Sequence, residues 1–357
     1  MRRIAIINQK GGVGKTTTVA NIAAALARAG QRVLVCDLDP QAHLTLHFGL
    51  DPSDDTPDMY DLLTGSASIA KARVKVGHNL WVVGASIDLA AAEVELVSIV
   101  GREVVLQGLL DQHVGDQKDT PFSKYDYILF DCPPSMGVLT LNGLCGADEV
   151  IIPLQPHYLA LQGLGKLLET VQLVSRRIHS VLRVSGVAIC MNDAGTRLAA
   201  EVVEDVRRFL ADARGTAVPW SKARLYESMI RRNIKLAEAP SYGQSIFDYA
   251  PESNGATDYE RLAQEIHASS CDQAASQEIS ASDDAASSET ASVENASVEN
   301  ASVESASSNT ASGRPHHTDP LAQVIPLPVS ATASEHASTS QERREISAPS
   351  HSADRTG

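Results

Sequence analysis

IAIINQKGGVGKTTT occupies residues 4–18 and passes from an apolar run into glycines and then into Lys-Thr-Thr. A helical pattern of apolar residues begins at Val19. The glycines within residues 11–14 let the backbone wrap so that its N–H groups point inward at an anion. A helix starting at Lys15 aims the positive end of its dipole at the same point. The stretch therefore predicts a phosphate-binding loop between a strand and a helix. The alternative is a glycine turn that happens to contain Lys-Thr.

The side chains around this loop suit a nucleotide with Mg²⁺. Lys15 can reach the β- and γ-phosphates, and the hydroxyl of Thr16 can ligand the ion. Asp131 ends another apolar strand, where a carboxylate beside a phosphate loop can hold Mg²⁺ through water. The alternative for Asp131 is an aspartate that caps the following helix. The loop residues expected to bind ATP are Lys10, Gly11, Gly12, Val13, Gly14, Lys15, Thr16 and Thr17.

Short β-branched runs alternate with longer Ala/Leu-rich segments through residues 1–268. Most of the short runs are apolar without strict alternation, as strands covered on both faces are. This order predicts an α/β fold, a doubly wound and mainly parallel sheet wrapped by helices, in one domain. The expected strands are 3–8, 32–37, 80–84, 127–131, 149–154 and 184–191, and the expected helices include 16–29, 158–179, 198–213 and 259–268.

The composition changes at the end of this domain. Residues 269–357 contain no aromatic side chain and carry a net charge of −9, out of −14 for the whole chain. The pentapeptide ASVEN at 291–295 occurs twice more, with one change, through residue 305, and this period matches neither helix nor strand. We expect a disordered acidic tail, because so few large apolar residues cannot offset the entropy of ordering. Since most of the acidity belongs to the tail, nucleic-acid binding by the front part stays open.

Apolar and cysteine content exclude several protein classes. The chain has no apolar run of about 18 residues, which excludes a membrane-spanning helix. Its first apolar run meets Lys10 and Gly11, so it is too short for the apolar region of a secretory signal. The five cysteines are isolated and are typical of buried residues in a reduced cytosolic protein. We therefore expect a cytoplasmic location.

One departure from the standard loop pattern G-x-x-x-x-G-K-[ST] is diagnostic, because Gln9 stands where the pattern has glycine and Lys10 follows it. The resulting KGGVGKTT resembles the deviant P-loop ATPases, and specifically the ParA/Soj family of chromosome- and plasmid-partitioning ATPases. The resemblance covers about residues 2–267. Further matching stretches are VLVCDLDPQ at 33–41, YILFDCPPS at 127–135, ADEVIIPLQ at 147–155 and LAEAPSYG at 236–243.

The resemblance implies roles for individual residues. Lys10 is similar to the family lysine that reaches across a nucleotide-sandwich homodimer to the partner's phosphates, and Asp39 resembles the residue needed for hydrolysis. Asp131 matches the Walker B aspartate. Asn192 matches a position used for base contacts, or is only a turn residue after a strand. Asp37 is expected to be structural, although spacing alone does not distinguish it from Asp39, since alternation puts both on one face.

Partitioning ATPases of this family bind DNA non-specifically, through Lys and Arg against phosphates. Two arginines carry this binding in the Soj branch. One corresponds to Lys235, which keeps the charge, and the other to Gly195, where the charge is lost; Arg197, two residues further on, could substitute for it. Arg232 lies in a stretch, residues 206–232, that is longer than in typical relatives. That stretch is either an enlarged basic surface or an ordinary solvated loop. Arg197, Arg232 and Lys235 are the expected DNA-binding residues.

Two other branches with the same ATPase core fit less well. MinD-like division-site ATPases end in a basic amphipathic helix that binds membrane, whereas an acidic segment follows the expected last helix here. Reductases similar to the nitrogenase iron protein hold an Fe–S cluster through cysteine thiolates. In this chain Cys132 lies inside the segment around Asp131, and Cys145 stands alone.

The sequence thus predicts a slow ATPase that acts as an ATP-dependent DNA-segregation switch, with Lys10, Lys15 and Asp39 as catalytic residues. ATP and Mg²⁺ are its expected cofactors. The expected partners are a second copy of the chain, non-specific DNA on the nucleoid, and a centromere-binding ParB-like protein that stimulates hydrolysis, with no membrane partner. The alternative is a ParA-like ATPase that positions a protein cargo by the same chemistry.

Overall fold

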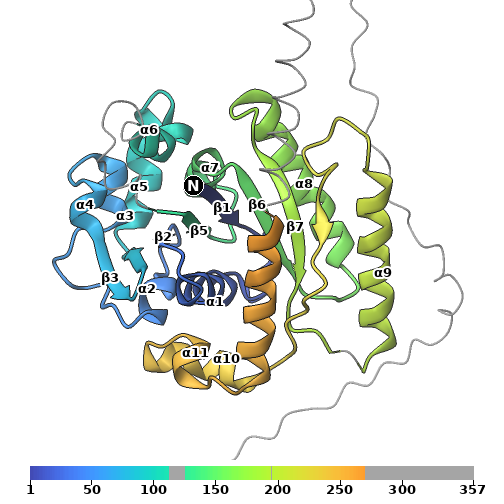
Figure 1. The fold of residues 1–357 in the computed structure, drawn as a ribbon. Coiled ribbons are helices and arrows are strands. Elements are labelled where there is room, and N and C mark those ends of the chain that lie inside the picture. Colours follow the sequence, from blue (N-terminus) through green and yellow to red (C-terminus); the bar gives the residue numbers. More distant parts are fainter. Residues whose placement is uncertain (112–124, 194, 270–357) are drawn as a thin grey trace, which may run out of the picture. The chain divides into compact units, whose positions relative to one another are not determined.

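The computed structural model describes residues 1–111, 125–193 and 195–269 (Figure 1). Within these ranges the strands are β1 (Arg2–Ile6), β2 (Val33–Asp37), β3 (Arg73–Gly77), β4 (Leu80–Val83), β5 (Tyr127–Asp131), β6 (Glu149–Leu154), β7 (Arg183–Ile189) and β8 (Arg224–Leu225). They form one sheet in the order β3-β4-β2-β5-β1-β6-β7-β8. β3 runs antiparallel to β4, and the other pairings of the described strands are parallel.

The expected mainly parallel, doubly wound sheet is confirmed. All six expected strands form, each within two residues of its predicted bounds. The prediction is incomplete at the two edges of the sheet, because the sequence does not indicate β3 and β8. β3 (RVKVG) is half exposed and β8 has two residues, so neither shows the apolar run by which a buried strand is recognised.

Helices cover both faces of the sheet (Figure 1). They are α1 (Lys15–Arg28), α2 (His43–His47), α3 (Met59–Thr64), α4 (Ile69–Ala72), α5 (Leu89–Glu95), α6 (Val105–Asp111), α7 (Val138–Gly146), α8 (Ala160–Arg177), α9 (Arg197–Asp212), α10 (Ile234–Glu238), α11 (Ile246–Tyr249) and a final helix at 254–269. Short 3₁₀ turns lie at Leu96–Ser98, Arg102–Val104 and Ala239–Tyr242. The final helix begins five residues before the predicted start at 259.

Side chains of the central strands alternate between two apolar cores, one on each face of the sheet. Ile4 and Ile6 of β1 pack with α1 and the final helix. Ala5 and the following Ile7 belong to the other core, which contains residues of α3 to α9. Because both faces are covered, both sets are apolar, which explains why the strands lack a polar alternation.

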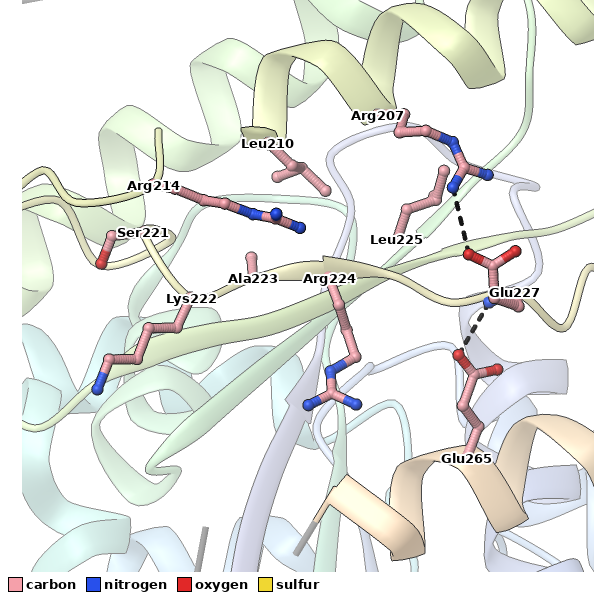
Figure 2. A pocket seen from close by; sticks show the side chains of 10 residues that line it. All are labelled: Arg207, Leu210, Arg214, Ser221, Lys222, Ala223, Arg224, Leu225, Glu227 and Glu265. Carbon is pink, nitrogen blue, oxygen red and sulfur yellow. Dashed lines mark hydrogen bonds and ion pairs between the residues drawn. The ribbon is translucent and has the colours of Figure 1, made fainter. Parts of the chain in front are cut away.

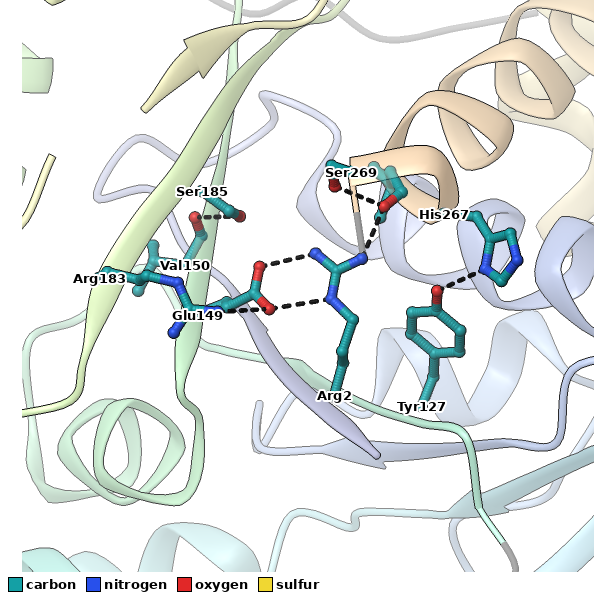
Figure 3. A network of polar contacts seen from close by, with 9 residues as sticks. Arg2, Tyr127, Glu149, Val150, Arg183, Ser185, His267 and Ser269 are labelled. Carbon is teal, nitrogen blue, oxygen red and sulfur yellow. Dashed lines mark hydrogen bonds and ion pairs between the residues drawn. The ribbon is translucent and has the colours of Figure 1, made fainter. Parts of the chain in front are cut away.

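A network of charged groups anchors the end of the final helix at the amino ends of the strands (Figure 3). Arg2 donates from Nε and Nη2 to the two carboxylate oxygens of Glu149, at 2.9 and 2.7 Å. Arg183 donates to the same carboxylate at 3.1 Å. Arg2 Nη1 also donates to the carbonyl of Ile266, at 2.6 Å, which holds the last turns of the helix against β1.

The predicted tail lies outside the described residues, except for Ser269 at the end of the final helix. Among the helices that the structure describes, none has the length and apolar character needed to cross a membrane.

Candidate functional site

The glycine loop connects the carboxyl end of β1 to the first turn of α1. Gly12 and Gly14 have φ values of 72° and 89°, in the left-handed region that favours glycine. The side chain of Asn8 fixes the start of the loop. It donates from Nδ2 to the carbonyl of Pro153 in β6 at 2.7 Å, and its Oδ1 accepts from the N–H of Lys10 at 3.0 Å. α1 begins at Lys15, as the sequence predicts.

The strand order brings the predicted acidic residues to this loop. β5 lies between β1 and β2, and Asp131 is in register with Ile6 on one side and with Asp37 on the other. In-register residues of parallel strands point to the same face. Two aspartates from distant parts of the chain therefore stand next to the point where β1 enters the loop.

Asp131 is buried beside Thr16 and Lys15 of the loop. Its side chain is 1% exposed, and neither carboxylate oxygen has a partner among the described residues. Burial and the charge of Asp37 raise the pKa of Asp131, and the Thr16 side chain and the charge of Lys15 oppose the rise. A buried carboxyl group with unused oxygens is unfavourable unless a cation or a donor is supplied. The donor set of Asp131 and Thr16 therefore fits a hard cation such as Mg²⁺.

The two lysines of the loop occupy different environments. Lys15 is 7% exposed. Burial lowers the pKa of Lys15, while the charges of Asp131 and Asp39 oppose this. Lys10 is exposed, and its Nζ lies 3.4 Å from Oε1 of Gln155. One lysine thus points into the site of its own chain, and the other is accessible at the surface.

The structure also separates the two aspartates of the DLDPQ stretch. Asp37 is fully buried and accepts from the backbone N–H and hydroxyl of Thr45, at 3.0 and 2.8 Å. Its buried position raises its pKa to about 7, and the hydrogen bonds oppose the shift. Asp39 lies past the end of β2, is half-buried, and accepts from the N–H of Gln41 at 3.0 Å. Strand alternation does not relate the two side chains, because the strand ends at Asp37.

Asn192 lies beyond the carboxyl end of β7, near the phosphate loop. The neighbouring Met191 has a φ of 51°, and its Cε is 3.8 Å from the position of a Cβ built on Gly14. Asn192 donates from Nδ2 to the sulfur of Met229 at 3.4 Å and forms an isolated parallel bridge with Arg231. The position is compatible with a base contact, which stays a prediction.

The candidate DNA-binding residues come from two segments that the Asn192–Arg231 bridge joins. Arg197 is 93% exposed at the start of α9 and pairs with Glu201 at 2.8 Å. Lys235 pairs with Glu238 at 2.9 Å. Arg232 is exposed and has no ion pair among the described residues. All three side chains are accessible from solvent, and their roles in DNA binding stay predictions.

Arg231, in the same long stretch, is bound differently. It makes a paired contact with Asp258 of the final helix, through Nε at 3.0 Å and Nη2 at 2.6 Å. Such a two-point pair fixes a guanidinium in place. Arg231 is therefore held in place by an ion pair, whereas the neighbouring Arg232 is accessible. No local pattern in the sequence distinguishes the two arginines.

Several residues that sequence analysis does not single out shape the site. Thr45 holds Asp37, Asn8 holds the loop, and Gln155 contacts Lys10. Thr18 lies in α1, and its hydroxyl is 3.1 Å from that of Tyr259 in the final helix. For Asn8 a local signal exists, because an Asn side chain commonly accepts from the backbone N–H two residues further on and so forms an Asx turn. The other contacts join residues far apart in the chain.

Comparisons with known proteins agree with this geometry. A family model described as an AAA domain matches residues 1–184. The sporulation initiation inhibitor protein Soj of Bacillus subtilis is 42% identical over 266 residues, which cover 74% of this chain and 98% of that protein. The chromosome-partitioning ATPase Soj of Treponema pallidum is 44% identical over 268 residues, covering 75% and 97%. The chain belongs to the Soj/ParA family of chromosome-partitioning ATPases.

A solved structure extends the comparison of this Soj/ParA chain to the nucleotide. Cobyrinic acid a,c-diamide synthase from Mycobacterium smegmatis, with bound ATP analogue and magnesium, is 36% identical, with a TM-score of 0.60. The match covers 74% of this chain and 93% of that protein. The Soj/ParA relatives and this structure both match about three quarters of the chain.

Proposed function

We propose that the chain is an ATP-dependent DNA-segregation switch. The observation that carries this proposal is the meeting of the glycine loop with the buried carboxylate of Asp131, whose oxygens have no hydrogen-bonding partner among the described residues. The Soj/ParA relatives support the direction of the proposal, and the synthase structure with ATP analogue and magnesium supports the pair of cofactors, ATP and Mg²⁺.

The loop residues hold and orient the nucleotide. N–H groups of the glycine loop bind phosphate oxygens at the start of α1, and Lys15 binds the β- and γ-phosphates. The Thr16 hydroxyl would hold Mg²⁺ directly, and Asp131 would hold it through water. When bound, Mg²⁺ neutralises charge on the phosphates during transfer. Asn192 contacts the base.

Hydrolysis depends on residues that differ in exposure. Asp39, half-buried beyond β2, orients the attacking water. Lys10 is exposed and reaches the phosphates of a second copy in a nucleotide-sandwich dimer, so its charge is available only after dimerisation. The dimer holds DNA on the nucleoid through Arg197, Arg232 and Lys235. A centromere-binding ParB-like protein then stimulates hydrolysis and releases the DNA.

The test is binding to a labelled duplex of random sequence, followed by fluorescence anisotropy with and without ATP and Mg²⁺, at several salt concentrations. We expect affinity that requires ATP and falls steeply with salt, because phosphate contacts release counterions. Removing the charge of Arg232 or Lys235 should weaken binding uniformly and reduce the salt slope by about one each. Arg176→Ala, an exposed arginine of α8, is the control. Binding that is equal without ATP contradicts the switch.

The lysines test the division of labour. Lys15→Ala should abolish ATP binding, measured by calorimetry, because it removes the buried cation of the loop. Lys10→Ala should retain binding but lower the partner-stimulated rate by about 10³-fold or more, since a cation supplied in trans acts on the transition state. Equal loss of nucleotide affinity in both variants contradicts the assignment.

Asp39→Ala tests water activation separately from binding. The variant should bind ATP, dimerise and stay on DNA, because only the hydrolytic step is removed. Hydrolysis at the wild-type rate contradicts the role of Asp39.

A further inference from the structure

A basic cavity lies at the β8 edge of the sheet, away from the phosphate loop. Its volume is about 560 Å³, and it is bounded by the end of α9, the segment that enters β8, and the final helix (Figure 2). Leu210 and Leu225 contribute apolar surface to its wall. The charged side chains that line it are Arg207, Arg214, Lys222, Arg224, Glu227 and Glu265.

The two carboxylates of the cavity already have partners. Glu227 accepts from Nη1 of Arg207 at 3.2 Å. Glu265 accepts from the backbone N–H groups of Glu227 and Ser228, at 2.9 and 3.1 Å. Figure 2 shows the contacts of Glu227 with Arg207 and with Glu265 on one side of the cavity. Neither carboxylate is therefore paired with the remaining cations.

Three other cations line the cavity. Arg214, Lys222 and Arg224 are exposed and form no ion pair or side-chain hydrogen bond among the described residues. Like charges around one concave surface raise its positive potential, because the low-dielectric walls focus the field. The cavity is thus suited to an anionic ligand with several charges, and guanidinium groups bind carboxylates in a two-point geometry.

The chain carries such an anion a few residues beyond Glu265, which lines the cavity. The final helix continues for one turn past Glu265, so Ser269 is about 6 Å further along the helix axis. Residues 270–305 contain eight acidic residues and no lysine or arginine. The first of the acidic residues, Asp272, is within about 10 Å of extended chain from Ser269.

We propose that this cavity binds the acidic segment of the same chain, residues 270–305, through Arg214, Lys222 and Arg224. The tether makes binding intramolecular and raises the effective concentration of the segment. None of the lining residues belongs to the phosphate loop, so nucleotide binding is not obstructed. The segment competes with other polyanions for these three cations. The proposal does not depend on the proposed function, and its test contains no nucleotide.

The test is carbodiimide cross-linking of the full chain at low protein concentration, analysed by mass spectrometry. The reagent joins a lysine amine and a carboxylate as an amide, with loss of one water that the carbodiimide takes up. Lys222 should cross-link to carboxylates of residues 272–304 at least fivefold more than Lys166, an exposed lysine of α8. The yield should fall severalfold from 0.05 to 0.5 M salt, because screening weakens the attraction.

A variant pair tests the cavity itself. Arg214→Gln with Arg224→Gln should lower the Lys222 yield severalfold, while Arg176→Gln with Arg177→Gln, which neutralises two exposed arginines of α8, should not. Circular dichroism checks that both variants fold. If the cavity variant does not fold, the wild-type comparison of Lys222 with Lys166 decides alone.

Three results overturn the proposal. The first is a Lys222 yield equal to that of Lys166. The second is cross-linking between isotopically distinct copies in mixed samples, which assigns the cavity to the segment of a second copy. The third is absent cross-linking together with protection of Lys222 from amine labelling by random-sequence DNA, which makes DNA the occupant.

Discussion

A carboxylate is buried at each end of the parallel sheet, but only one of the two is paired with arginines. At the amino ends of the strands, Glu149 is 2% exposed and is bound by Arg2 and Arg183. At the carboxyl ends, Asp131 is 1% exposed and has no hydrogen-bonding partner among the described residues. The two residues are of the same chemical type and lie in the same sheet.

The difference separates stability from binding. A buried charge is unfavourable unless it is paired. A paired carboxylate can therefore be part of the fold, whereas a carboxylate without a protein partner lowers the stability of the fold until a ligand binds it. Glu149 connects three strands and, through Arg2, the final helix. Asp131 leaves its oxygens available beside the glycine loop. A substitution at each residue should therefore have opposite effects on the empty protein.

The largest effect should come from Glu149→Gln. It leaves the buried guanidinium of Arg2 without its counter-charge, and breaking a buried pair from one side costs about 3–5 kcal/mol. Urea unfolding measures the loss. Glu201→Gln, in the exposed pair with Arg197, is the control and should leave the midpoint unchanged. An unchanged midpoint for Glu149→Gln contradicts the structural role of the network.

Asp131→Asn should do the reverse in the protein without nucleotide. An amide cannot ionise, so the variant avoids the cost of a carboxyl group whose charged form is disfavoured by burial, and the urea midpoint at pH 7 should rise. The same variant should lower ATPase activity by about 10–100-fold, as expected for a residue that holds a metal through water. Glu252→Gln on the surface is the control. A fall in the stability of the empty protein would place Asp131 among structural carboxylates.

The stabilisation by Asp131→Asn should depend on pH. The pKa of Asp131 in the folded protein is raised by burial above its ordinary value near 3.8. A raised acid pKa means that the folded state keeps its proton longer, so the residue's destabilising contribution is absent below about pH 4 and grows as pH rises toward the folded pKa. The difference in unfolding free energy between wild type and variant should increase from pH 4 to 7. A constant difference contradicts the origin in burial.

The smallest effect should distinguish the two arginines around Glu149. Arg183 is 39% exposed, whereas the side chain of Arg2 is 13% exposed. Because solvent screens the more exposed charge, Arg183→Ala should cost about 1 kcal/mol or less, and Arg2→Ala should cost more. Urea unfolding of both variants measures the order. The reverse order would show that Arg183 carries the network.

Local sequence was sufficient for the elements whose causes are local. Apolar runs located the six interior strands within two residues, and Lys15 after the glycines marked the start of α1. Gly12 and Gly14 have left-handed backbone that favours glycine, so the loop could be recognised from residue types alone. These features depend on neighbours within a few residues, and periodicity reads such neighbours directly.

Long-range pairing decided the rest. Asp131 lies beside Ile6 and Asp37 because β5 is inserted between β1 and β2. Parallel strands are joined by long crossovers, so neither strand's own sequence specifies its neighbour or the register of the pair. The end of β2 at Asp37 separated that residue from Asp39. Asp258 of the final helix made Arg231 structural while Arg232 stayed accessible. Burial and pairing are properties of the folded chain, so identical residue types acquire different chemistry only once the strands and helices are packed.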